Sequence, residues 1–233
     1  MQVNLLPWME RTADAPVFRE IAQQDLLRFL SVGVQTRVQD GHTIFLRGDS
    51  PTAVYLILGG SVRISTLAAS GKCIVVEIFQ RGELFGEIGA IDDGMRTADA
   101  TAMGPVELLT IPSGAFRELL ATSAPFANKI LRIVINRLRR TYSLLEDASL
   151  RSVEQRLAKQ VLYLVRLGVS GETKVRLQSR MHQDDLADLL GVTTRSIINV
   201  LNKWRAEGLV SFDGRAAQLT ILDMKRFRDL LEE

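Results

Sequence analysis

The chain has 233 residues and a formal net charge of +2, and 46% of its residues are hydrophobic, as in folded globular proteins with room for two modest domains. A single cysteine, Cys73, excludes an internal disulfide and a four-cysteine iron–sulfur cluster. The two histidines, His42 and His182, lie far apart without ligand-like neighbours, so we expect no metal site. The apolar runs are much shorter than the roughly 20 residues that span a bilayer. The first residues also lack the pattern of a signal peptide, and we therefore expect a cytoplasmic protein without membrane contact.

Charge is distributed unevenly along the chain. Residues 1–128 carry 10 Lys and Arg against 14 Asp and Glu, residues 129–180 carry 12 against 4, and residues 181–233 carry 7 against 9. A basic middle segment suits an anionic partner such as nucleic acid. It equally suits a solvated helix surface, and charge alone leaves both interpretations open.

The stretch from Thr36 to Pro112 has the pattern of short strands. Runs rich in β-branched residues alternate with glycine-containing turns such as RGDSP, GGS and AASGK. This pattern favours a small barrel or sandwich over parallel βαβ units. The expected strands are 42–46, 54–58, 61–66, 73–79, 97–102 and 106–111, and a helix near 17–30 is expected to pack against them.

After Pro112 the periodicity becomes helical. Ser113 is expected to cap a short helix, and a long helix is expected over 124–150. In the long helix, residues recur at alternating spacings of four and three, which is the pattern of a coiled-coil seam and predicts a symmetric dimer. The seam residues are Ala127, Leu131, Val134, Leu138, Thr141, Leu145 and Ala148. Four apolar residues on other faces favour packing against the helix's own domain as well: Phe126, Ile130, Ile133 and Ile135.

Residues 152–233 predict a second unit. An amphipathic helix over 153–167 and a turn at 169–172 precede two helices, Gln183–Leu190 and Thr193–Arg205, that are joined by a short link. This is the pattern of a helix-turn-helix, whose second helix enters the major groove of DNA. A helical hairpin alone could serve other purposes, but the β-hairpin that follows resembles a wing and favours DNA binding. The candidate DNA-binding residues are Gln183, Thr193, Thr194, Arg195, Ser196, Asn199 and Lys203.

The stretch FGEIGAIDDGMRTA, residues 85–98, predicts a loop that holds a small nucleotide. It places Glu87 and Arg96 nine residues apart, with glycines that let backbone N–H groups converge on a phosphate. A guanidinium matches phosphate oxygens in two parallel bonds, and a carboxylate can accept from a ribose 2′-hydroxyl. These residues alone leave open a structural salt bridge between Glu87 and Arg96.

From about residue 17 to 233, the chain resembles the CRP/FNR family of transcription regulators. The matching features are RGD (47–49), GGSV (59–62), the FGEIG and RTA of the 85–98 stretch, the long helix and the winged helix-turn-helix. The resemblance implies an α+β fold with a jelly-roll-like cyclic-nucleotide-binding β-roll over 1–122, a dimerisation helix over 123–150 and a winged helix-turn-helix domain over 151–233. It also implies a homodimer that binds a cyclic mononucleotide, double-stranded near-palindromic DNA and RNA polymerase, with no cofactor beyond its allosteric ligand.

The resemblance also implies roles for particular residues. Glu87 would take the ribose 2′-hydroxyl and Arg96 the cyclic phosphate, with a hydroxyl from Thr97. Cyclic AMP and cyclic GMP both suit this set, and we favour cyclic AMP. The remaining nucleotide-binding candidates are Gly86 and Ala98 through their main chain, Ile88 beside them, and Arg137 and Thr141 on the long helix, where Thr141 would reach the purine.

Three alternatives are weighed against this interpretation. The regulator could respond to another ligand or be constitutively active, although retention of both Glu87 and Arg96 argues against losing the nucleotide. Haem-sensing and iron–sulfur relatives use cysteines or histidines that this chain lacks. An enzyme with Glu87, Asp92 or Asp93 as acid and base has no supporting nucleophile–His pair, Walker loop or metal cluster.

Thr194, Arg195 and Asn199 stand where the best-known cyclic AMP receptor has Arg, Glu and Arg, so the DNA target need not be the same.

Overall fold

The structure is a computed structural model that describes residues 23–68, 71–165, 174–177 and 179–231. Contacts divide the chain into two units, Met1–Ile64 with Phe79–Thr141, and Ser65–Ile78 with Tyr142–Glu233. Helix α2, Gln23–Ser31, corresponds to the part of the expected helix 17–30 that is described. The remainder of that helix lies outside the described residues.

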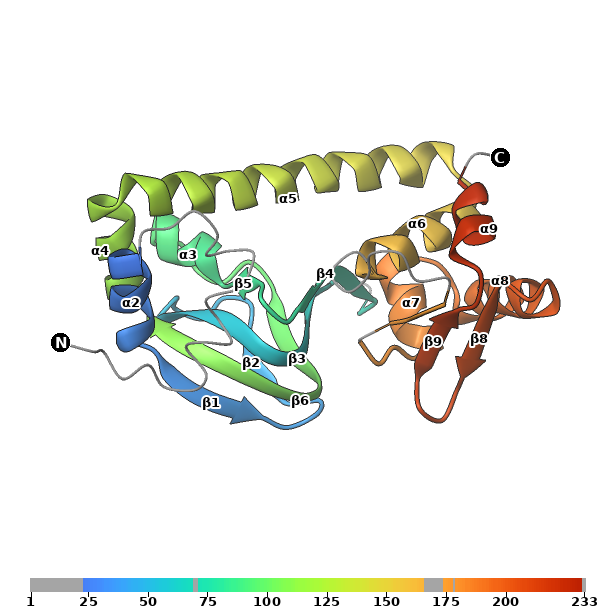
Figure 1. Ribbon diagram of the computed structural model, residues 1–233, viewed down its shortest axis with the longest axis horizontal. Coiled ribbons are helices and arrows are strands. Elements are labelled where there is room, and N and C mark those ends of the chain that lie inside the picture. Colours follow the sequence, from blue (N-terminus) through green and yellow to red (C-terminus); the bar gives the residue numbers. More distant parts are fainter. Residues whose placement is uncertain (1–22, 69–70, 166–173, 178, 232–233) are drawn as a thin grey trace. The chain divides into compact units, whose positions relative to one another are not determined.

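A six-stranded sheet dominates the N-terminal half of the chain (Figure 1). Its strands lie in the order β1–β6–β3–β4, while β2 pairs with β6 and β5 pairs with β3. The pairs β1–β6, β2–β6 and β3–β5 are antiparallel, as expected for a barrel or sandwich rather than βαβ units. The strands are β1 Val34–Val38, β2 Thr43–Phe45, β3 Ala53–Leu67, β4 Cys73–Gln80, β5 Leu84–Phe85 and β6 Asp99–Pro112.

Strands β3 and β6 are longer than the sequence pattern predicted. The expected strands 54–58 and 61–66 form the single strand β3, and 97–102 and 106–111 fall mostly within β6. The predicted breaks are wrong because Gly60 and Gly104 adopt φ of +83° and +75°, which bends a strand without ending it. A Cβ at Gly60 would lie 2.5 Å from the carbonyl oxygen of Pro105, so only glycine fits where the two bends meet.

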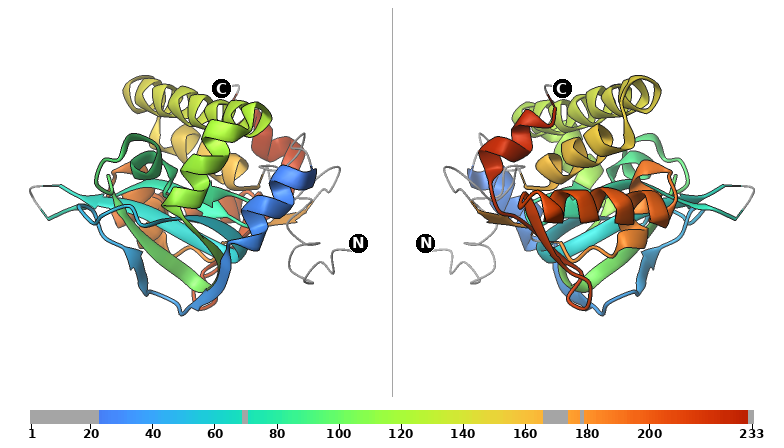
Figure 2. Two further views of the ribbon diagram at one scale, coloured as in Figure 1. Left: turned by 90° about the vertical axis from the view of Figure 1, so that its left-hand side faces the viewer. Right: turned by 90° about the vertical axis from the view of Figure 1, so that its right-hand side faces the viewer.

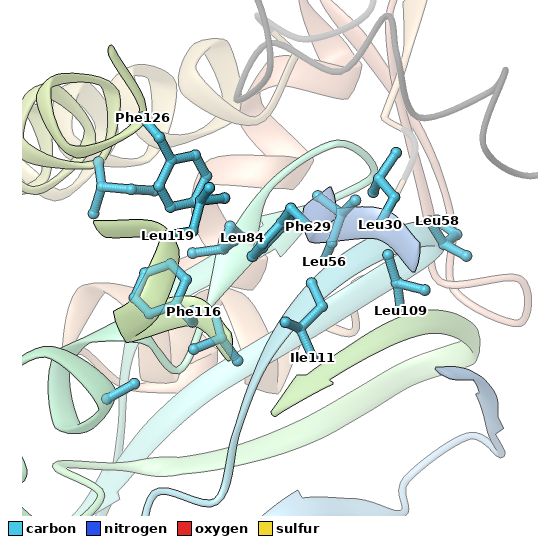
Figure 3. Close-up of a cluster of buried hydrophobic side chains, with 13 residues drawn as sticks. Phe29, Leu30, Leu56, Leu58, Leu84, Leu109, Ile111, Phe116, Leu119 and Phe126 are labelled. Atoms are coloured by element: carbon cyan, nitrogen blue, oxygen red, sulfur yellow. The ribbon is translucent and has the colours of Figure 1, made fainter. Parts of the chain in front are cut away.

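Three helices close one side of the sheet over an aromatic cluster (Figure 3). Phe29 of α2, Phe116 of α4 (Ser113–Thr122) and Phe126 of α5 (Ala124–Leu150) have ring centroids 5.2–6.2 Å apart. Figure 3 shows these rings gathered beside sheet residues that include Leu56 and Ile111. Buried aromatic pairs of this kind contribute beyond their area, so the cluster fixes the start of α5 against the sheet.

The prediction that Ser113 caps α4 is wrong. The residue that precedes the helix is Pro112, and no side chain caps it. Ser113 is buried inside the first turn, where its hydroxyl donates to the carbonyl oxygen of Pro51. The hydroxyl thus satisfies a loop carbonyl rather than a helix N–H.

Helix α5 has two different faces. Phe126 and Ile130 are fully buried against their own unit, whereas Ile135, which was expected to join them, is 38% exposed. On the seam face Leu131, Leu138 and Leu145 are 56%, 50% and 62% exposed. The single chain therefore leaves most of the heptad face open to solvent.

The second unit contains the predicted helix-turn-helix. Helices α7, Gln183–Leu190, and α8, Thr194–Ala206, match the expected ranges, and Gly191 between them has φ +68°. Strands β8, Val210–Asp213, and β9, Gln218–Ile221, form the wing hairpin beside α8 (Figure 2). Helix α6, Val153–Val165, precedes them, and the expected turn 169–172 lies outside the described residues.

Two elements of this unit had no counterpart in the sequence pattern. A short strand β7, Val175–Arg176, pairs with β9 and completes a three-stranded sheet. A last helix α9, Met224–Asp229, places Phe227 edge-on against Trp204 of α8, with ring centroids 4.9 Å apart. Both rings are fully buried, so α9 anchors the C-terminal half of α8.

Candidate functional site

The 85–98 stretch contains a short helix where a loop was expected. Helix α3, Glu87–Asp92, begins directly after Gly86 and ends at Asp93. Gly86 has φ +78°, and a Cβ there would lie 2.8 Å from Nη1 of Arg96. Glycine at this position therefore both turns the chain into α3 and leaves room for the guanidinium.

Glycine occupies the other two positions of the stretch for different structural reasons. A Cβ at Gly89 would lie 2.6 Å from the carbonyl oxygen of Gly94, so α3 can pack on its own return segment only without a side chain there. At Gly94 the nearest atom to a Cβ is a carboxylate oxygen of Asp92, 3.0 Å away. The Asp92 carboxylate in turn accepts from the Gly94 N–H, which tightens the turn.

The RGD segment holds the backbone of Arg96. The N–H of Gly48 donates to the Arg96 carbonyl, and the N–H of Arg96 donates to the carbonyl of Asp49, both at 2.9 Å. The Asp49 carboxylate accepts from the N–H of Leu46 and so closes its own turn. Two distant motifs of the sequence thus form one structural unit around the arginine.

Arg96 is 4% exposed, and its guanidinium is held by main-chain carbonyls and by the side chains of Phe45 and Tyr55. Nη1 donates to the carbonyl oxygen of Gly86 at 2.6 Å, and Nη2 donates to that of Ala53 at 2.5 Å. The guanidinium carbon lies 4.2 Å from the centroid of the Phe45 ring and 5.7 Å from that of Tyr55. Nε is buried and has no hydrogen-bond partner among the described residues.

No carboxylate among the described residues forms an ion pair with Arg96. Burial lowers the pKa of this guanidinium, because loss of water disfavours its charged form, while Tyr55, Glu87 and Asp49 oppose that shift. A buried cation without a paired anion is costly in an apolar interior. The arrangement is therefore suited to receive an anion.

Glu87 is paired with Arg137 of α5. The carboxylate is 3% exposed, and Nη1 of Arg137 donates to its Oε1 at 2.5 Å. Nη2 of Arg137 donates to the carbonyl of Leu84, and the guanidinium lies over the Phe79 ring at 4.3 Å. The salt bridge of Glu87 that the sequence left open is thus made with α5 and not with Arg96.

The remaining nucleotide candidates lie around this centre. Thr97 is exposed, Ala98 is buried behind it and Ile88 is exposed on α3. Thr141 lies one turn beyond Arg137 on α5, is exposed, and donates its hydroxyl to the Arg137 carbonyl at 3.0 Å. The structure therefore brings together Gly86, Glu87, Arg96 and Arg137, while within the described residues Thr141 bonds only the main chain of Arg137 and Thr97 makes no side-chain bond to the four.

The end of the helix-turn-helix that we expect to face DNA lies where α7 and α8 begin. Thr193 caps α8 as predicted, since its hydroxyl accepts from the N–H of Ser196. The Thr193 and Ser196 hydroxyls also bond each other at 2.9 Å, and the Thr194 hydroxyl donates to Oδ1 of Asp184 at 2.6 Å. Arg195 and Asn199 are exposed one turn apart and make no side-chain bond within the described residues.

The two remaining DNA-binding candidates, Lys203 and Gln183, differ in their placement. Lys203 forms an ion pair with Glu154 of α6 at 2.8 Å, and the same carboxylate accepts from the Trp204 indole. Gln183 is half-buried at the first position of α7. The structure thus engages Lys203, a DNA-binding candidate of the sequence, in an ion pair within its own unit.

Sequence reasoning missed four residues that matter at these sites. Phe45 and Tyr55 flank Arg96, and Asp184 and Asn202 join the exposed surface at α7 and α8. Asn202 had a usable signal, because it follows Arg195 and Asn199 at helical spacing. The other three depend on contacts between elements that no local pattern reveals.

Among the described residues, no three or more His, Cys, Asp or Glu side chains are grouped so that they could hold a metal ion. None of the described helices has the length and apolar character needed to cross a bilayer.

Comparison with known families assigns both units. Residues 35–123 match the model of the cyclic nucleotide-binding domain, and residues 155–230 match that of the Crp-like helix-turn-helix domain. A CRP-like cAMP-activated global transcriptional regulator of Mycobacterium tuberculosis is 29% identical over 181 residues, which cover 77% of this chain and 81% of the relative. A cyclic AMP receptor protein of Thermus thermophilus is 28% identical over 196 residues, with 84% of this chain and 88% of the relative covered.

Solved structures agree in fold. FixK2 from Bradyrhizobium japonicum has a TM-score of 0.75 at 19% identity, over 85% of this chain and 97% of that one. A putative cAMP-binding regulatory protein from Silicibacter pomeroyi has a TM-score of 0.67 at 24% identity, over 97% and 99%. With its mixed helix and strand fold, its N-terminal cyclic nucleotide-binding domain and its C-terminal helix-turn-helix, the chain belongs to the CRP/FNR family of transcription regulators.

Proposed function

We propose that the protein is a homodimeric transcription regulator that binds a cyclic mononucleotide, with cyclic AMP favoured over cyclic GMP, and then binds a near-palindromic DNA site. The domain limits that we propose are 1–122 for the nucleotide-binding β-roll, 123–150 for the dimerisation helix and 151–233 for DNA binding. We place its action in the cytoplasm, where bacterial DNA and RNA polymerase would be its partners.

The observation that carries this proposal is the buried and unmatched charge of Arg96. Within the part of the chain that the structure describes, no carboxylate pairs with its guanidinium and no acceptor bonds its Nε. A cyclic phosphate would supply both the missing negative charge and an acceptor for Nε. Glycine at 86 keeps the N-terminus of α3 open to that phosphate, because no Cβ covers the guanidinium.

The pairing of Glu87 with Arg137 supports two further parts of the proposal. One is the contact of Glu87 with the ribose, and the other is the coupling of nucleotide binding to α5. Only one oxygen of the carboxylate, Oε1, is bonded to Arg137, so the other can accept from a ribose 2′-hydroxyl. A nucleotide held by Glu87 and Arg96 would then act on α5 through Arg137. A ligand shifts a conformational equilibrium only through such differential contacts.

The open face of α5 supports a dimer. Leu131, Leu138 and Leu145 recur at seven-residue intervals and are half or more exposed. A second copy of the helix would bury all three in a coiled-coil seam. A symmetric pair would present two copies of α8 to DNA, which favours a near-palindromic target.

A second candidate function keeps the DNA binding and changes the ligand. A global nitrogen regulator of Synechococcus elongatus is 26% identical over 175 residues, with 73% of this chain and 78% of the relative covered. Relatives of this architecture thus include one that is not named for a cyclic nucleotide. The unmatched Arg96 still favours an anionic ligand in this chain.

Titration calorimetry with cyclic AMP and cyclic GMP tests the ligand directly, and a gel shift on random-library DNA tests the response. We expect saturable binding of one nucleotide and a shifted band that depends on it. Heat of binding from neither nucleotide, together with an unchanged shift when they are added, would favour the constitutive or differently liganded regulator.

A further inference from the structure

The first residue of α8 is tied to α7 by a hydrogen bond at the end proposed to face DNA. The hydroxyl of Thr194 donates to Oδ1 of Asp184 at 2.6 Å. Asp184 is exposed, and its Oδ2 has no partner within the described residues. A carboxylate therefore lies on a surface that is expected to approach a polyanion.

This pair has a fixed hydrogen-bonding polarity. The Thr194 hydroxyl has one hydrogen, and Asp184 accepts it, so the hydroxyl can offer only lone pairs to a third group. The ionised carboxylate also offers only lone pairs. The Asp184–Thr194 pair is thus an acceptor-only centre, whereas Arg195 offers only donors and Asn199 offers both.

In the major groove, the hydrogen-bond donors on base edges are the amino groups of adenine and cytosine, while guanine and thymine present acceptors at the corresponding positions. An acceptor-only, negatively charged centre meets acceptor edges with unfavourable electrostatics, and it lacks any donor for them. Carboxylates in DNA-binding proteins accept from the N4 amino group of cytosine.

We infer that Asp184 is a specificity-determining residue that selects cytosine at one position of each half-site. The inference rests on the proposed DNA binding and adds to it a residue outside the recognition helix. Thr194 positions the carboxylate through its hydroxyl. Arg195 and Asn199 read neighbouring base pairs, for which guanine and adenine are the matching partners. Asp184 also makes the wrong base costly, because a carboxylate that meets no amino group remains desolvated beside DNA.

Selection from a random DNA library, followed by competition with single-base variants of the selected site, tests the inference. The full-length protein and the variants Asp184→Asn, Asp188→Asn and Thr194→Val are compared with cyclic AMP, with cyclic GMP and without nucleotide. Asp184→Asn keeps an acceptor for Thr194 and adds a donor. Asp188→Asn is the matched control, because it removes the same charge four residues further along α7.

We expect the parent protein to prefer cytosine by about fivefold or more at one position of each half-site. Asp184→Asn should abolish that preference or shift it toward guanine or thymine, and Thr194→Val should weaken it. Asp188→Asn should leave the preferred base unchanged. Superimposable preferences of the parent and Asp184→Asn would overturn this inference and leave the proposed function standing. A parent that selects no sequence under any of the three conditions would overturn both.

Discussion

The environment of Arg96 gives the strongest indication that the proposed ligand is an anion. Structural arginines in protein interiors are normally paired with carboxylates, because an unpaired buried charge is destabilising. Here the available carboxylate, Glu87, is engaged by Arg137, and Arg96 is left with two carbonyls and the faces of Phe45 and Tyr55. Rings and carbonyls stabilise the guanidinium, and Glu87 and Asp49 favour its charge from a distance, but no carboxylate of the described residues pairs with it directly.

Replacing Arg96 by alanine should therefore weaken nucleotide binding by about tenfold or more, because hydrogen bonds to a charged group contribute about 1.5–3 kcal/mol. Arg96→Lys keeps the charge and loses the planar fork, so its affinity should fall between the two. Calorimetric titration of the three proteins measures the effect, and circular dichroism verifies that the variants are folded. A folded alanine variant with parental affinity would show that this arginine is not the phosphate ligand.

At the residue scale, the sequence indicates candidate side chains but not the residues that they contact. The 85–98 stretch identified Glu87 and Arg96 from their chemistry and spacing. Their partners come from β2, β3 and α5, which are far away in the sequence. Local pattern carries no information on such tertiary contacts, so the distinction between a Glu87–Arg96 pair and a Glu87–Arg137 pair needed the fold.

At the scale of elements, helices with a clear period were predicted well and strands with glycines were not. The limits of α7 and α8 follow from caps and apolar spacing, which are local. The glycines of β3 and β6 were interpreted as turns, although Gly60 and Gly104 only bend strands that continue to pair. A positive φ serves a turn and a bulge equally, and the pairing partner decides between them.

The seam of α5 gives a prediction at the same scale. Leu138→Lys would remove one buried leucine from each protomer of the proposed dimer, at about 1.5–3 kcal/mol each, and would place two like charges near each other. We expect the dimer dissociation constant to rise by about a hundredfold or more in sedimentation velocity. Asn136→Lys, an exposed position off the seam, adds the same charge and should leave association unchanged. An undisturbed Leu138→Lys dimer would contradict the coiled-coil interpretation.

A substitution at Thr141 tests whether α5 couples nucleotide binding to DNA binding. This residue is a polar member of the seam, and its hydroxyl at present bonds only its own helix. We expect Thr141→Ala to retain much of the nucleotide affinity, because Glu87 and Arg96 remain, and to lose most of the nucleotide-dependent gain in DNA binding. Fluorescence anisotropy of labelled DNA with and without saturating nucleotide measures that gain. Equal activation of the variant and the parent would rule out this route.

For the whole molecule, the proposed two-fold dimer would set the geometry of the DNA site. Two recognition helices of such a dimer read half-sites about one helical turn apart, roughly 34–36 Å between centres. Footprinting of the selected site should show two symmetric protected segments at that spacing, and insertion of about five base pairs between them should abolish tight binding by turning the half-sites to opposite faces. Insertion of a full turn should be tolerated better than insertion of half a turn. A single protected segment would mean that one reader is sufficient.

The length of α5 has a mechanical consequence. The helix is continuous over 27 residues, so at 1.5 Å per residue it is a lever of about 40 Å. Arg137 lies at the middle of this helix, so a tilt of about 5° about that point would displace either end by about 1.7 Å, about half the rise of one base pair along DNA. In the proposed dimer the two displacements would together approach one base-pair rise, so a side-chain rearrangement around one nucleotide would bring the two recognition helices into or out of register with the grooves.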